Sequence, residues 1–284
     1  MRDYLELTKP RITWLILMST GIGFIFGLAT NSAAFAWLTL FHTLCGTALI
    51  ASGTAALNQW FESGADALMQ RTRQRPIPSG RVARTPALLF AVALSILGFA
   101  QLTLLVNVLT GALGLFTLVT YIGIYTPMKR RSPHATTLGA IPGAMPPLIG
   151  FAASADSLTW GAAALFAILF VWQFPHFYAI AWMYREDYGR AGIRMLPVVE
   201  PDGQSTARRI LAFLVLLIPV SLTPTLLGMT GSLYFAGALL LGGYFLKAGI
   251  QVFRDRSLPG ARAVLLASVL YLPALYGLML LDRA

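Results

Sequence analysis

The chain has 284 residues, of which 57% are hydrophobic and only 11% are charged, and its mean hydropathy is +0.70. A soluble domain carries roughly twice this share of charged residues, so the composition excludes a soluble enzyme and indicates an integral membrane protein. The formal net charge of +10 then reports membrane topology and attraction to anionic lipid or substrate, and we expect no nucleic-acid partner.

Apolar stretches recur along the whole chain, and most are long enough to span a bilayer core, which takes about 20 residues. They predict an all-α, polytopic membrane protein with nine transmembrane helices. The fifth stretch is short and contains Pro142, Pro146 and Pro147, so neighbouring helices must cover its broken backbone. The stretches lie at approximately 12–30, 35–57, 86–106, 108–127, 138–153, 159–183, 209–228, 230–250 and 262–281.

The basic residues give an independent check, because an alternating topology confines Lys and Arg to every second loop. All of them except Arg283 fall at the N-terminus or in and beside the loops after the second, fourth, sixth and eighth stretches. We therefore expect a bacterial cytoplasmic (inner) membrane protein whose N-terminus is cytoplasmic and whose C-terminus lies outside.

Three polar side chains recur every four residues at the end of the second stretch: Asn58, Glu62 and Asp66. On a helix this spacing puts them on one face. Hard oxygen ligands of this kind suit Mg²⁺, which binds one or two carboxylates together with substrate phosphates. Topology alone would explain the arginines that follow but not the carboxylates. These arginines, which can donate to phosphate oxygens, are Arg71, Arg73, Arg75, Arg81 and Arg84.

A second charged loop follows the sixth stretch and contains Arg185, Glu186 and Asp187. The two motif loops, at about 58–85 and 184–208, are four helices apart and emerge on the same face. This predicts one domain over 1–284, built from two pseudo-duplicated four-helix halves. Two acidic loops that face one another could hold a diphosphate between two metal ions, and a site of this kind beside apolar helices indicates a lipid diphosphate.

Prenyl transfer fits these groups, because metal ions and arginines stabilise a leaving diphosphate while aromatic faces stabilise the allylic cation. Membrane interfaces also collect aromatic residues, so any one of them can be structural. The aromatic residues near the cytoplasmic ends of the fourth and sixth stretches are Tyr121, Tyr125, Trp172, Phe174, Phe177, Tyr178 and Trp182.

Taken in order, several short motifs resemble the protohaem IX farnesyltransferases, a family of UbiA-type intramembrane prenyltransferases. The resemblance covers nearly the whole chain. It implies nine transmembrane helices around a central cavity with a cytoplasmic active site. The motifs are Leu7-Thr8-Lys9-Pro10-Arg11, Asn58-Gln59 with Glu62 and Asp66, Arg71-Thr72, Arg75-Pro76, Tyr125-Thr126-Pro127 with Lys129-Arg130-Arg131, Gly143-Ala144 with Pro146-Pro147, Trp172-Gln173-Phe174-Pro175-His176, Asp187-Tyr188 and Met195-Leu196-Pro197.

The resemblance also implies a reaction, in which farnesyl diphosphate, haem B and water give haem O and diphosphate. It assigns Asn58, Glu62 and Asp66 to one Mg²⁺, and Asp187 with Glu186 to a second. The wider superfamily spaces two aspartates by four in its second motif, and this chain departs from that pattern. The remaining residues implied are Arg71, Arg75, Lys129, Arg130 and Arg185 for diphosphate, Tyr125 for catalysis, and His176 for haem.

Other functions stay open. An enzyme of the same superfamily could prenylate an aromatic or quinone precursor. A transporter is disfavoured, because no Asp, Glu, Lys or Arg lies in the middle of a predicted helix. An oxidase assembly factor would not require metal-ligand spacing. Expected partners are farnesyl diphosphate, haem B and membrane lipid, with a haem-delivering or oxidase-assembly protein left open.

Overall fold

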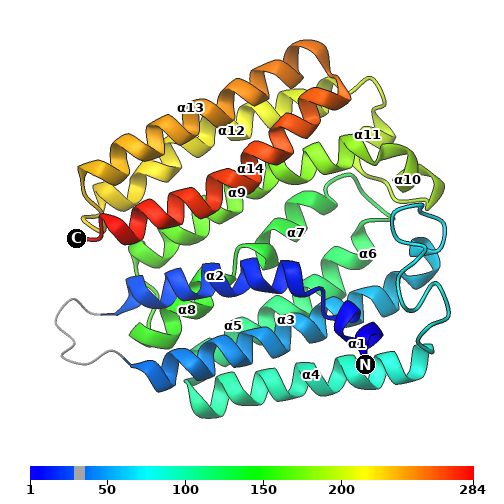
Figure 1. The fold of residues 1–284 in the computed structure, drawn as a ribbon, viewed down its shortest axis with the longest axis horizontal. Helices are drawn as coiled ribbons and strands as arrows, with labels where there is room; N and C mark the ends of the chain where they lie inside the picture. Colours follow the sequence, from blue (N-terminus) through cyan, green and yellow to red (C-terminus); the bar gives the residue numbers. More distant parts are fainter. Residues whose placement is uncertain (29–35) are drawn as a thin grey trace.

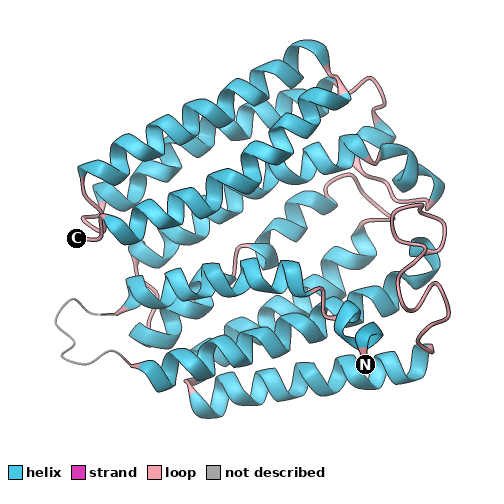
Figure 2. Ribbon diagram, viewed as in Figure 1, coloured by secondary structure: helices cyan, strands magenta, loops and turns pink. Residues whose placement is uncertain are grey.

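The computed structural model describes residues 1–28 and 36–284, and nine helical spans in this part are long and apolar enough to cross a membrane. Figure 2 shows that helices dominate the described chain. The predicted spans are confirmed, while the end of the first and the start of the second lie partly outside the described residues. The spans are α2 (Pro10–Gly27), α3 (Trp37–Asp66), α4 (Arg84–Leu105), α5–η1–α6 (Val108–Val119, Thr120–Tyr125 and Thr126–Met128), α7–α8 (Ala135–Gly143 and Pro146–Ala155), α9 (Trp160–Met183), α12 (Gln204–Leu226), α13 (Ser232–Asp255) and α14 (Leu258–Leu281).

The spans form two groups that lie side by side (Figure 1). In one, α3 packs on α4 and α2 packs on α8; in the other, α12 and α14 pack on α9 while α13 covers them. Most of the largest hydrophobic cluster belongs to the second group. The predicted internal duplication stays a prediction, although the boundary between the groups falls between α8 and α9.

The fifth span breaks where its prolines predict. Pro142 lies inside α7, and the helix restarts as α8 at Pro146. Gln173 of α9 donates from Nε2 to the carbonyl of Ala140, at 3.1 Å, beside the break. The backbone of α2 approaches α8 so closely that a Cβ on Gly150 would lie 1.8 Å from the carbonyl oxygen of Thr20. Neighbouring helices therefore cover the irregular backbone, as expected.

Three short helices, α1 (Arg2–Leu7), α10 (Arg185–Arg190) and α11 (Leu196–Val199), lie at the end of the bundle that also carries the loop between α3 and α4 (Figure 1). The C-terminus lies at the opposite end. The two motif loops thus share one end of the molecule with the N-terminal helix.

Candidate active site

The polar face of α3 carries the first predicted motif. Helix α3 runs 30 residues to Asp66, so Asn58, Glu62 and Asp66 all lie on the helix. Asn58 and Asp66 are 1% and 0% exposed, and Glu62 is partly buried. Side chains this polar are buried only with partners that satisfy them. Each of the three has a cationic partner.

Arg75 is the partner of Asp66. Its Nη1 atom donates to Oδ1 and Oδ2 of the carboxylate, at 2.9 and 2.7 Å. The hydroxyl of Thr72 donates to the backbone carbonyl of Asp66 at 3.0 Å, and the amide of Arg75 donates to the carbonyl of Thr72. This tight turn brings an arginine nine positions along the chain back onto the end of α3.

Lys129 is the partner of Glu62, with Nζ 2.8 Å from Oε1. Burial lowers the pKa of Lys129, but the neighbouring Tyr125 hydroxyl and the Glu62 carboxylate raise it more, so the net pKa lies above its ordinary range. Lys129 therefore stays protonated at neutral pH. It was predicted to bind diphosphate, and it lies at the acidic face of α3.

Lys9 is a site residue that sequence reasoning missed. It directly precedes α2 in the left-handed conformation, with φ of 48°, and its Nζ donates to Oδ1 of Asn58 at 3.1 Å. Burial, followed by the positive charges of Arg75 and Lys129, lowers the pKa of Lys9 to about 7. The only signal in the sequence was its place within a family motif, because spacing cannot link it to a residue 49 positions away.

Asp187 joins the second motif loop to the first. Its carboxylate is buried and accepts hydrogen bonds from the backbone amides of Gln70 and Arg71, at 3.2 and 3.3 Å. Arg190 forms an ion pair with it. Burial raises the pKa of Asp187, but the two amides and Arg190 lower it more, so the carboxylate is ionised at neutral pH. The two motif loops are thus in contact through Asp187.

One predicted metal ligand, Glu186, and one predicted diphosphate ligand, Arg130, do not join this cluster. Glu186 precedes Asp187 on α10, and its side chain is exposed, because successive residues on a helix point about 100° apart. Arg130 is also exposed, although it follows Lys129 directly. Within residues 1–28 and 36–284, no group of three or more His, Cys, Asp and Glu side chains is placed to hold a metal ion. The exposed Glu186 side chain therefore lies apart from the buried Asp187 carboxylate.

Arg71 lies against an aromatic ring of the second loop, and Arg185 lies against a ring at the end of α9. The Arg71 guanidinium is 4.9 Å from the ring centroid of Tyr184 and donates to the hydroxyl of Tyr188 at 3.4 Å. Arg185 lies 4.5 Å from the ring centroid of Trp182 and donates to its carbonyl at 3.0 Å. Neither guanidinium is paired with a carboxylate in the described chain, so both keep donors for an anion.

Tyr125 ends η1, a π-helical turn beside the site. Pro127 has no backbone N–H to continue an α-helical ladder, and π-helical turns are frequent at functional sites. The Nζ atom of Lys129 lies 4.4 Å from the ring centroid of Tyr125. A Cβ on Gly139 would lie 2.5 Å from the same ring, so a glycine is required there. The ring thus packs between α7 and the Lys129 ammonium that pairs with Glu62.

His176 lies in α9, outside the cluster of charged residues. Its Nδ1 is 2.7 Å from the hydroxyl oxygen of Ser268 in α14, and its ring stacks on Trp172 with centroids 4.9 Å apart. Sequence reasoning missed Ser268, which stands in an apolar run without any motif.

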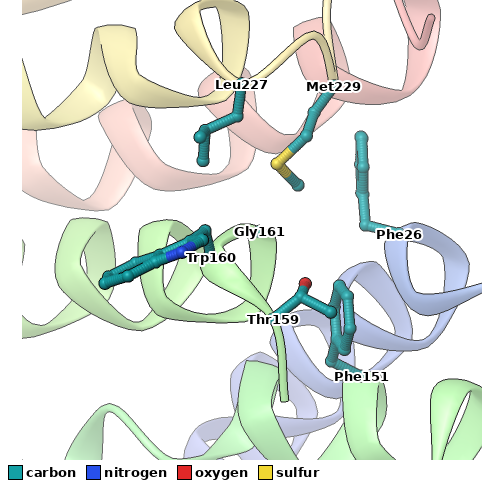
Figure 3. Close-up of a pocket in the computed structure, with 7 residues that line it drawn as sticks. All are labelled: Phe26, Phe151, Thr159, Trp160, Gly161, Leu227 and Met229. Carbon is teal, nitrogen blue, oxygen red and sulfur yellow. The ribbon is translucent and has the colours of Figure 1, made fainter. Parts of the chain in front are cut away.

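A separate pocket of about 300 Å³ lies near the start of α9 and the end of α12, and Figure 3 shows the side chains that line it. It contains no acidic or basic side chain, so it does not suit a diphosphate. It is lined by Phe26, Phe151, Thr159, Trp160, Gly161, Leu227 and Met229.

The oxygen donors on α3 fit Mg²⁺. Two carboxylates and one amide are hard ligands, and all three accept hydrogen bonds from the basic side chains of Arg75, Lys129 and Lys9. Their number agrees with an ion that completes its shell with water and substrate phosphate.

Comparison with known proteins agrees with this geometry. A family model described as the UbiA prenyltransferase family matches residues 14–274. The protoheme IX farnesyltransferase of Solibacter usitatus (strain Ellin6076) is 64% identical over 100% of this chain and 99% of its own length. The protoheme IX farnesyltransferase of Koribacter versatilis (strain Ellin345) is 48% identical over 100% of this chain and 94% of its own length.

Solved structures share the fold at low identity. A digeranylgeranylglyceryl phosphate synthase superposes with a TM-score of 0.81 at 16% identity, over 99% of this chain and 97% of that one. A UbiA homologue from Archaeoglobus fulgidus, bound to GPP and Mg²⁺, superposes with a TM-score of 0.65 at 15% identity, over 98% of this chain and 99% of that one. The matched span and the full-length relatives agree: this chain belongs to the UbiA prenyltransferase family.

Proposed function

We propose that this integral membrane protein transfers the farnesyl group of farnesyl diphosphate to a vinyl group of haem B, with water, to give haem O and diphosphate. The observation that carries the choice of substrates is the full-length relative at 64% identity, a protoheme IX farnesyltransferase. The cluster of basic residues around the acidic face of α3 supports the diphosphate half of this proposal independently.

In this proposal, Asn58, Glu62 and Asp66 hold Mg²⁺, with Asp187 facing them from the second loop. When bound, the ion would supply positive charge that stabilises the departing diphosphate. The Mg²⁺ and GPP named for the Archaeoglobus fulgidus structure support a metal ion and a prenyl diphosphate in this fold. Glu186, whose side chain is exposed, is left out.

The cations around these acids are the proposed diphosphate ligands. Arg75 and Lys129 now neutralise Asp66 and Glu62. Because a diphosphate brings several negative oxygens, both cations gain new acceptors when it binds. The guanidinium groups of Arg71 and Arg185, which have no carboxylate partner in the described chain, add donors from both motif loops. Arg130 is exposed, so any contact it makes is at the edge of the site.

The proposed reaction needs only farnesyl diphosphate, haem B and water as reactants. The allylic C–O bond breaks, and its electron pair leaves with the diphosphate. The haem vinyl group attacks the farnesyl cation to form a C–C bond, which leaves a cation beside the ring. Water adds to that cation and releases a proton. In this proposal, the ring of Tyr125 holds the Lys129 ammonium in place during these steps by a cation–π contact, and His176 binds the haem.

We further propose that the end of the bundle with α1, α10 and α11 faces the cytoplasm in a bacterial inner membrane. The basic residues gathered there support this orientation. Farnesyl diphosphate would then reach the site from the cytoplasmic leaflet, where anionic lipid also favours basic loops. A haem-delivering or oxidase-assembly protein stays open as a partner.

The identity of the prenyl acceptor, haem B or an aromatic acid, can be tested directly. Purified protein in detergent is incubated with Mg²⁺, farnesyl diphosphate and either haem B or an aromatic acid, in water enriched in ¹⁸O. The proposal predicts haem O that carries ¹⁸O in its new hydroxyl, detected by chromatography and mass. Prenylation of the aromatic acid alone would reassign the chain to the aromatic branch of its family.

A further inference from the structure

The hydroxyl of Ser268 connects two neighbours that both need a hydrogen bond. Ser268 is 0% exposed. Its Oγ lies 2.6 Å from the carbonyl oxygen of Leu265 and 2.7 Å from Nδ1 of His176. Both distances are those of hydrogen bonds, and each requires one hydrogen between the two heavy atoms.

Counting hydrogens fixes the tautomer of His176. A serine hydroxyl has a single hydrogen, and a backbone carbonyl can only accept. The hydroxyl must therefore donate to Leu265, and Nδ1 of His176 must carry the hydrogen that it donates to Oγ. In a neutral imidazole the other nitrogen, Nε2, then has a free lone pair.

The surroundings hold the ring in this orientation. Trp172 donates from Nε1 to the carbonyl of Ser268 at 2.9 Å, and its ring lies against that of His176 at an interplanar angle of 22°. Within the part of the chain that the structure describes, no protein group is hydrogen-bonded to Nε2, and the side chain is partly exposed. The imidazole is thus fixed on one side and available on the other.

We propose that Ser268 is a positioning residue that holds His176 in its Nδ1–H tautomer and so presents Nε2 as an axial ligand to the iron of the haem substrate. Histidines that bind metals commonly donate their second ring N–H to a neighbouring group, and a histidine nitrogen is a usual haem ligand. This inference rests on the proposed function, because it requires haem as the acceptor.

His176 lies within the membrane-spanning helix α9 and not in the loop that follows it. It precedes the end of α9 at Met183 by seven residues, which corresponds to roughly 10 Å along the helix. An iron bound at His176 would therefore lie within the apolar part of the bundle.

The test is a titration of purified protein with ferric haem B, read by absorption and electron paramagnetic resonance. We expect a histidine-ligated spectrum from the native protein and its loss in His176→Ala. Ser268→Ala should bind haem roughly 10- to 100-fold more weakly, whereas Ser268→Thr, which keeps the hydroxyl, should restore the native spectrum. Ser95→Ala is the matched control, since Ser95 is a buried serine whose hydroxyl bonds only the carbonyl of Ala91.

A second measurement does not depend on the variants. The ¹⁵N shifts of His176 in the haem-free protein should show a protonated Nδ1 and an unprotonated Nε2. The opposite tautomer, or a native spectrum without histidine ligation, would overturn the inference, as would Ser268→Ala with unchanged haem affinity and spectrum. If haem O still forms in any of these cases, the proposed function stands; if the native protein neither binds haem nor forms haem O, both fail.

Discussion

Arg75 and Asp66 form an ion pair in which one guanidinium nitrogen donates to both carboxylate oxygens, at 2.9 and 2.7 Å. The Asp66 side chain is 1% exposed and that of Arg75 is 23% exposed. The pair joins the end of α3 to the loop that follows it, because an arginine of this loop neutralises the last polar residue of the helix. The carboxylate proposed to bind Mg²⁺ is therefore already oriented.

Removing Arg75 should lower the free energy of unfolding of the protein. Arg75→Met leaves the Asp66 carboxylate buried without its partner, and we expect a loss of about 3 kcal/mol, the lower end for a broken buried pair because Arg75 is partly exposed. Equilibrium unfolding in detergent measures it. Asp66→Asn combined with Arg75→Met should recover much of the loss, and an equally unstable double variant would contradict this reading of the pair.

The two adjacent acids of α10 should differ sharply in activity. Asp187 is buried against the first motif loop, whereas Glu186 is exposed. Asp187→Asn should lower the rate of haem O formation about 10- to 100-fold, as the loss of a metal ligand or of its orienting partner does. Glu186→Gln is the matched control and should stay within roughly twofold of the native rate, as surface substitutions do. An equal loss of rate in Glu186→Gln and Asp187→Asn would show that Glu186 also belongs to the active site.

Much of the fold could be predicted because hydropathy and the placement of Lys and Arg are both imposed by the membrane. The spacing of Asn58, Glu62 and Asp66 likewise predicted their shared helix face. Contacts between distant segments could not be predicted. Nothing in the sequence links Lys9 to Asn58, or Ser268 to His176, because packing of separate helices decides those pairs. The exposure of Glu186 could have been inferred, since neighbours on a helix point in different directions.

The aromatic ring of Tyr125 should matter more than its hydroxyl. The ring faces Lys129 at 4.4 Å and is wedged against Gly139. Tyr125→Phe keeps that face and should retain activity within roughly threefold, whereas Tyr125→Leu should lose about 10-fold, the equivalent of one cation–π contact. Steady-state rates of haem O formation separate the two. A severe loss in Tyr125→Phe would instead assign the hydroxyl a role in proton transfer.

Lys9 should make the stability of the protein depend on pH near neutrality. Its pKa falls from 10.5 to about 7 on folding, so between these values the unfolded chain binds more protons than the folded one, and stability rises with pH. The cost of the buried charge is complete below about pH 7 and disappears toward pH 10.5.

Thermal unfolding of the metal-free protein checks this, with Lys9→Met as the reference. The stability of the native protein relative to this variant should increase as the pH rises from about 7 to about 10. A difference that stays constant over this window would show that Lys9 keeps an ordinary pKa.

The acidic face of α3 is proposed to bind the Mg²⁺ and diphosphate that farnesyl transfer to haem requires. The most direct measurement is haem O formation by purified native protein and by Asp66→Asn, each incubated with haem B, farnesyl diphosphate and Mg²⁺, with folding of both verified by thermal unfolding. We expect haem O from the native protein, its disappearance on chelation of Mg²⁺, and a loss of about 100-fold or more in Asp66→Asn. No haem O from folded native protein, or an undiminished rate in Asp66→Asn, would contradict the account.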